Sequence, residues 1–167
     1  YDIPSTGMRF FTVYGPLGRP DMAPMIFADA IMNKKPIKIF NYGKMKRDFT
    51  FIDDIVECII RCSLKPPTKD LILKEFPNDS LNLNAPHKIF NFGNSHAIQL
   101  LDFIETLEKE LNQTAKKEYH SIQPGDVLET EADTSNLQKW VNFVPNTSLK
   151  KGIEKFAKWY IKYSKNG

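Results

Sequence analysis

The stretch Gly7–Tyr14 (GMRFFTVY), followed directly by Gly15–Pro20 (GPLGRP), decides the fold class of this chain. Its apolar and β-favouring residues predict a buried β-strand that ends in a Gly/Pro turn. A strand of this kind normally lies inside a parallel sheet whose two faces are covered by helices. No strand–helix unit precedes it in the sequence. We therefore expect an α/β chain that forms the later part of a larger protein.

The composition indicates an ordinary globular protein. Apolar residues make up 41% and charged residues 26% of the 167 residues, and the net charge is +3. This charge is too small to indicate a nucleic-acid partner. No apolar run approaches the roughly 20 residues needed to span a bilayer, and no secretory signal pattern is present, so we expect no membrane partner. Cys58 and Cys62 have helical spacing, and we interpret them as reduced thiols of a cytoplasmic protein.

Helices and strands are predicted to alternate along the rest of the chain. Apolar residues at helical spacing predict helices at 24–33, 99–111, 134–141 and 148–163. A further helix follows Asp53, which we interpret as an N-cap or first-turn acid. Alternating residues predict strands at 36–40, 47–52, 88–92 and 116–122. The proline-rich segment 65–87 is interpreted as an exposed excursion. The lysines of the last helix are interpreted as a solvated face.

Three polar elements follow predicted strands, where open α/β sheets bind their ligands. Near the first strand, Thr12 and Arg19 could grip a carboxylate or phosphate; the alternative is an ordinary turn with Arg19 on the surface. In KMKRDF, Arg47 is suited to a pyrophosphate; the alternative is an edge strand protected by lysines. In QPGDV, Asp126 can accept hydrogen bonds from a diol; the alternative is a simple Pro-Gly turn.

Four motifs together resemble one family. The runs RFFTVYGPLGRPDMA, YGKMKRDFTFIDDIV, FNFGN and QPGDVLETEAD resemble the NAD-dependent epimerase/dehydratase family, the extended short-chain dehydrogenases. Within that family, the similarity is greatest to the UDP-glucuronate 4-epimerase group. The resemblance covers nearly the whole chain in the expected order. It implies that residues 1–21 are the last strand and turn of a Rossmann nucleotide-binding domain, and that 22–167 form the C-terminal substrate-binding domain.

The resemblance also implies which residues bind the UDP-sugar. Thr12 and Arg19 match positions near the uronate carboxylate, and Arg47 matches the arginine that contacts the pyrophosphate. Asp126 matches the acid that holds the ribose hydroxyls, and Gln123 stands where some relatives have an arginine at the phosphates. The walls around the nucleotide would include Phe40 to Tyr42. The implied substrate site therefore comprises Thr12, Arg19, Met22, Ala23, Arg47, Gln123 and Asp126.

The same resemblance implies NAD as the cofactor, with most of its binding site outside this chain. Val13, Tyr14 and Pro16 match the turn beside the nicotinamide ring. The family reaction needs a Gly-rich turn for the NAD pyrophosphate and a Tyr-x-x-x-Lys pair on a helix. The chain has no such glycine fingerprint. Its one Tyr-x-x-x-Lys match, Tyr42 with Lys46, lies between two predicted strands, and we reject it. No catalytic residue is expected in this chain.

The leading hypothesis is that the chain is the substrate-binding part of an NAD-dependent nucleotide-sugar epimerase, a UDP-glucuronate 4-epimerase, and that it is inactive by itself. The alternatives are a UDP-glucuronate decarboxylase, a sugar-nucleotide dehydratase or an epimerase of neutral UDP-hexoses in the same family. An alternative of another class is a stand-alone nucleotide-sugar binding module. The resemblance implies a homodimer for the full-length protein. The three histidines have no metal-ligand spacing, and no metal is expected.

Overall fold

The chain folds into a mixed α/β structure, described here from a computed structural model over residues 2–78 and 85–165. The strands are β1 (Ser5–Phe10), β2 (Thr12–Tyr14), β3 (Pro36–Ile39), β4 (Lys46–Phe51), β5 (His87–Phe92), β6 (Ala97–Gln99), β7 (Lys116–Tyr119) and β8 (Glu129–Thr130). The helices are α1 (Ala23–Met32), η1 (Phe40–Gly43), α2 (Ile52–Leu64), α3 (Lys69–Glu75), α4 (Leu100–Leu111), α5 (Ser135–Val141) and α6 (Leu149–Lys165).

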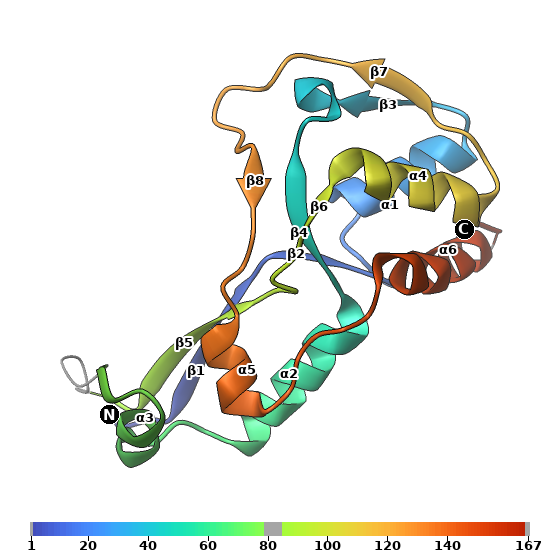
Figure 1. Cartoon of the computed structure of the whole chain (residues 1–167). Coiled ribbons are helices and arrows are strands. Elements are labelled where there is room, and N and C mark those ends of the chain that lie inside the picture. The colour runs from blue at the N-terminus through green and yellow to red at the C-terminus, as the bar shows by residue number, and fades with distance from the viewer. Residues whose placement is uncertain (1, 79–84, 166–167) are drawn as a thin grey trace.

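The strands form three small sheets. β1 pairs in parallel with β5, and β3 pairs in parallel with β7. The third sheet has the order β2-β4-β6, with β8 also paired to β4. In this sheet only the β4–β6 pairing is antiparallel. β4 thus contacts three other strands, and it runs through the middle of the molecule between the two groups of helices in Figure 1.

The predicted strand over residues 7–14 is divided into β1 and β2, and the expectation of one continuous buried strand is wrong. The two parts pair with different partners, β1 with β5 and β2 with β4. Phe11 lies at the break, where its N–H donates to the carbonyl of Phe92 at 2.9 Å. Residues of β1 are only partly buried, and the side chain of Phe10 is 49% exposed. Within the described residues, β5 is the one strand that pairs with β1, and the other edge of β1 has no strand partner.

Two apolar cores lie on either side of the middle of the molecule. The first core lies among α1, α4, α6, β3 and β4, in the upper part of Figure 1, and includes Phe27, Ile37, Phe49, Phe103 and Phe156. The second core lies among α2, α5 and β5, in the lower part, and includes Ile55, Phe90, Phe92, Leu137 and Trp140. Each of α2, α4 and α6 presents one apolar face to a core, as the spacing of its residues predicts.

Helix α2 confirms two details of the sequence interpretation. It begins at Ile52, so that Asp53 and Asp54 lie in its first turn, where acidic side chains complement the helix dipole. Cys58 and Cys62 are buried in the second core as free thiols. Burial raises the pKa of Cys58 to about 12 and that of Cys62 to about 11. Both side chains therefore act as small apolar residues.

The segment 65–87 is not a purely exposed excursion, and that expectation is wrong for its helical part. The Thr68 side chain caps α3 by accepting a hydrogen bond from the N–H of Leu71 at 3.2 Å. Ile72 and Phe76 are buried, and the Phe76 ring stacks on Trp140 of α5 with 6.1 Å between centroids. Because prolines are scattered through this segment, the sequence pattern did not predict this short amphipathic helix. Residues 79–84 of the predicted excursion lie outside the described residues.

The domain boundary after residue 21 remains a prediction. Within the described residues, β1 shares its sheet with β5, which follows it by about 80 positions in the register Ser5↔His87. The first strand therefore packs with segments from the middle of the chain.

Candidate functional site

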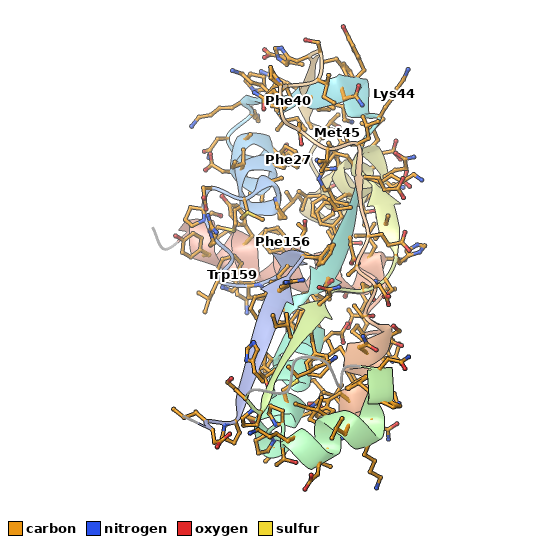
Figure 2. The ribbon with its side chains drawn as sticks, turned by 90° about the vertical axis from the view of Figure 1, so that its left-hand side faces the viewer. Phe27, Phe40, Lys44, Met45, Phe156 and Trp159 are labelled. Atoms are coloured by element: carbon orange, nitrogen blue, oxygen red, sulfur yellow. The ribbon has the colours of Figure 1, made fainter. Side chains whose placement is uncertain are left out.

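A pocket of about 660 Å³ lies beside the first core, between α1, β3, η1 and β4. Apolar side chains supply most of its wall, among them Phe27, Phe40 and Met45, which Figure 2 labels in the upper part of the molecule. Polar side chains of different elements reach the same pocket: Thr12, Asp21, Lys38, Arg47 and Asp126. An apolar wall with a few convergent polar groups is the usual form of a small-molecule site.

Arg47 reaches this pocket because β4 alternates. Successive side chains of a strand point to opposite faces, and Arg47 and Phe49 both line the pocket. The Arg47 guanidinium donates one hydrogen bond to the Lys46 carbonyl at 2.9 Å and another, at 2.9 Å, to Asp126 Oδ1. Its side chain is only 19% exposed, so the cation is held in a defined orientation at the pocket wall.

Asp126 comes from a turn far along the chain. Its backbone N–H donates to the Gln123 carbonyl at 3.1 Å, and its Oδ1 accepts the N–H of Val127 at 3.0 Å. Gly125 has a φ of +83°, which the turn requires. β8 follows the turn and pairs with β4 beside Arg47. The predicted pyrophosphate and ribose residues are thus brought together, and they form an ion pair with each other.

Three further predicted substrate residues also line the pocket. Thr12 reaches it from β2, Met22 precedes α1, and Ala23 begins that helix. Pro24 follows at an early helical position, where its missing N–H leaves no hydrogen bond unmade.

Arg19 and Gln123 are not among the pocket-lining residues. The exposed guanidinium of Arg19 instead forms an ion pair with the carboxylate of Asp21, two residues along the chain. This contact lowers the pKa of Asp21 below its ordinary value. Asp21 itself lines the pocket, so Arg19 lies beside the site. Gln123 is exposed on the turn that carries Asp126.

The predicted cofactor residues differ in their surroundings. Val13 packs on the second core, and Pro16 is partly buried. Tyr14 is buried in the first core against Phe51 and Phe103, each with 5.6 Å between ring centroids. Burial raises the pKa of its hydroxyl well above the ordinary value, with the Asp54 charge as a smaller cause. The Tyr14 side chain is therefore a core group, and only its backbone could adjoin a ligand.

Sequence reasoning missed two charged side chains at this pocket, Asp21 and Lys38. Lys38 was detectable, because alternation in PIKIF places it on the face opposite the buried Ile37 and Ile39. Asp21 was visible in the GRPD run, but local sequence could not tell whether Arg19 or its acidic neighbour would face the pocket.

Comparisons with known proteins identify the relatives of this chain. The sequence profile of the NAD dependent epimerase/dehydratase family matches residues 1–71. Protein CapI of Staphylococcus aureus is 44% identical over 99% of this chain and 49% of its own length. A probable UDP-glucuronate 4-epimerase of Rhizobium meliloti is 43% identical over 96% of this chain and 47% of its own length. The chain is thus similar to the NAD-dependent epimerase/dehydratase family by its profile over residues 1–71, and to these relatives over nearly its whole length.

The fold of this chain agrees with a solved structure. UDP-glucuronic acid 4-epimerase of Bacillus cereus, in complex with UDP-glucuronic acid and NAD, superposes with a TM-score of 0.78 at 32% identity. The match covers 96% of this chain and 46% of that protein. The predicted family and the predicted α/β fold class are both confirmed. The chain spans about half the length of the curated relatives it matches.

None of the described helices has the length and apolar character required to cross a bilayer. No group of three or more His, Cys, Asp or Glu side chains with metal-binding geometry occurs within residues 2–78 and 85–165.

Proposed function

We propose that this chain is the UDP-sugar-binding part of an NAD-dependent nucleotide-sugar epimerase, with UDP-glucuronate as the substrate and C4 as the reacting carbon. The observation that carries the proposal is the convergence of Arg47 and Asp126 on one pocket with Thr12. Arg47 and Asp126 come from segments 79 residues apart. Their meeting favours a binding site over the separate local turns that each motif could otherwise form.

Each of these side chains has a chemical task in the proposed site. The Arg47 guanidinium presents several donors in a fixed planar arrangement, which suits a diphosphate. Asp126 accepts hydrogen bonds, which suits the vicinal hydroxyls of a ribose. The apolar wall with Phe40 excludes water from the nucleotide and strengthens both polar contacts. Binding a diphosphate would require Arg47 to share its donors between the ligand and Asp126.

NAD supplies hydride transfer in the proposed full reaction, but residues 2–78 and 85–165 do not form a complete site for it. The buried Tyr14 side chain cannot reach a ligand, and Val13 has only an apolar side chain. The sequence also lacks the Gly-rich turn that accommodates the NAD pyrophosphate. Tyr42 lies in η1 and Lys46 in β4, so this pair does not share a helical face. We therefore assign NAD binding and proton transfer to residues outside this chain.

The preference for an acidic sugar rests on Arg19. Its side chain is 74% exposed beside the pocket, and its partner Asp21 is a carboxylate that a sugar carboxylate could replace. On this ground we propose UDP-glucuronate as the substrate. The resemblance to the family supports the further proposal that the full-length protein is a homodimer. A cytoplasmic location is also retained, because the two buried thiols are unpaired. A same-family decarboxylase or dehydratase would use the same nucleotide contacts, and assay of the full-length protein for its product distinguishes them.

Calorimetric titration of this chain with UDP and with NAD⁺ tests the proposal. We expect measurable UDP binding and none to NAD⁺. Arg47→Ala should weaken UDP binding by about 10- to 150-fold, the equivalent of roughly 1.5–3 kcal/mol for a charge-assisted contact. The matched control is Lys46→Ala, which removes the neighbouring cation and its exposed pair with Glu129. Tight NAD⁺ binding, or equal effects of the two substitutions, would contradict the proposal.

A further inference from the structure

A buried carboxylate lies directly behind the proposed ligand-binding face of β4. Asp48 stands between Arg47 and Phe49, which both line the pocket, so alternation directs it to the other face of the strand. Its side chain is wholly buried. A charged side chain in such a place needs partners for both oxygens. Asp48 therefore has a task that contact with a pocket ligand does not explain.

The partners of Asp48 are backbone N–H groups from two other segments. Oδ1 accepts the N–H of Asn94 at 2.8 Å, and Oδ2 accepts the N–H groups of Ser95 and Ala132, both at 3.0 Å. The Thr50 hydroxyl donates to Oδ1 at 3.2 Å. One carboxylate thus ties β4 to the β5–β6 connection and to the segment that follows β8.

The surrounding backbone is shaped for this contact. A Cβ added at Gly93 would lie 2.4 Å from the Ala132 Cβ and 2.9 Å from Asp48 Oδ2, so only glycine lets these segments approach. Ser95 has a φ of +50°, an uncommon conformation for a residue with a side chain. Its hydroxyl donates to the Ala132 carbonyl at 2.8 Å, which fastens the same two segments a second time.

The segment held at Ala132 is the one that carries Asp126. Between these residues lies β8, only two residues long, which pairs with β4 in the register Arg47↔Thr130. So short a strand supplies few hydrogen bonds of its own. The Asp48 contact to Ala132 therefore fixes the C-terminal end of the segment 126–132. At the N-terminal end of the same segment, Asp126 Oδ1 lies 2.9 Å from the Arg47 guanidinium nitrogen.

We propose that Asp48 is a positioning residue for the nucleotide site: its carboxylate holds the segment 126–132 against β4, and thereby sets the place of Asp126 relative to Arg47. This inference rests on the proposed function for its ligand. It predicts that loss of one carboxylate oxygen alters binding at a pocket that Asp48 does not touch. An Asn side chain has the shape of Asp, but either orientation of its amide turns an NH₂ group toward a backbone N–H donor.

The test compares Asp48→Asn with Thr50→Val, which removes the fourth donor to the same carboxylate and leaves the three N–H bonds intact. UDP affinity is measured by calorimetry, and amide hydrogen exchange is followed over residues 123–132, at a temperature where circular dichroism shows each variant folded. Asp48→Asn should weaken UDP binding by about 10-fold and speed exchange in this segment by a similar factor, as expected for about 1.4 kcal/mol. Thr50→Val should change both by less than about two-fold.

Wild-type affinity and wild-type exchange in folded Asp48→Asn would overturn the inference. If Asp48→Asn does not fold, Gly93→Ala gives the decision, because its Cβ presses on both Ala132 and Asp48 Oδ2 and so disturbs their contact while the carboxylate itself is kept. Gly93→Ala should then lower UDP affinity, and unchanged affinity would overturn the inference. If the wild-type chain binds no UDP, the proposed function is wrong, while the exchange rates still decide whether Asp48 holds the segment.

Discussion

Gly152→Ala is expected to destabilise the chain, against the usual effect of this substitution inside a helix. Gly152 lies in the first turns of α6, where alanine would normally stabilise a helix by roughly 0.5–1 kcal/mol. A Cβ at this position, however, would overlap the Tyr14 hydroxyl oxygen and lie 2.8 Å from Tyr14 Cζ. The next nearest atom is Phe51 Cδ2, at 3.0 Å. Both rings are buried in the first core and cannot easily move.

The size of the effect follows from two opposing terms. Overpacking of a close-packed core by one methyl group costs about 1–3 kcal/mol. Subtracting the gain in helix propensity leaves a net destabilisation of about 0–2.5 kcal/mol, with a central value of about 1 kcal/mol. The Tyr14 hydroxyl contributes little of its own, because its one hydrogen bond, to the Leu149 carbonyl, is 3.5 Å long. Tyr14→Phe should therefore cost less than about 1 kcal/mol.

A double-mutant cycle read by urea and thermal unfolding tests this reasoning. In the Tyr14→Phe background the closest atom is gone, so Gly152→Ala should cost about 1 kcal/mol less than in the wild type. For a chain of this size, 1 kcal/mol shifts the Tm by about 2–4 °C. A stabilising Gly152→Ala, or two substitutions whose effects simply add, would refute the packing described for α6 against Tyr14.

Further predictions concern the second core. Native Cys58 and Cys62 should react with a thiol reagent at pH 8 far more slowly than in urea, since pKa values of about 12 and 11 leave little thiolate; fast native labelling would contradict their burial. Both folded pKa values exceed the ordinary thiol value of 9.0. The stability that the two protonated thiols contribute should therefore be complete below pH 9 and lost as the pH rises toward 11–12. Unfolding curves measured across this pH range would reveal the loss. Phe76→Ala should lower the free energy of unfolding by about 3–5 kcal/mol through lost packing on Trp140, whereas Leu73→Ala on the exposed side of α3 should have a much smaller effect; equal effects would restore the interpretation of this segment as an exposed excursion.

The sequence predicts the helices well, because each long helix has a regular apolar face. Strands were harder, and the division between β1 and β2 shows why. GMRFFTVY consists mostly of apolar and β-favouring residues, and nothing in the local sequence indicates that Phe11 is where the chain changes its strand partner from β5 to β4. Pairing depends on segments far along the chain, which a local pattern does not contain. The local sequence also failed to predict α3, because prolines lie on both sides of this short helix.

Within the site, the sequence predicts the residue types better than their contacts. Arg47 and Asp126 were each recognised from local chemistry and resemblance, but only the fold shows that they pair. Arg19 bonds to its near neighbour Asp21, because a carboxylate two residues away is easier to reach than the pocket. Asp48 was missed although its signal was present: an acid on the buried face of a strand must find several donors.

The two cores have a consequence for how the molecule can be divided. Their buried residues alternate along the sequence, with the first core drawn from 14–51, 103–115 and 153–160, and the second from 55–92 and 137–141. No continuous fragment contains one core complete without part of the other. A proteolytic or engineered half would therefore expose apolar surface from both, and neither core can melt while the other keeps all of its strands. The chain should thus unfold as one cooperative unit, so that a ligand held at β4 would stabilise α3 and α5 as strongly as the helices beside it.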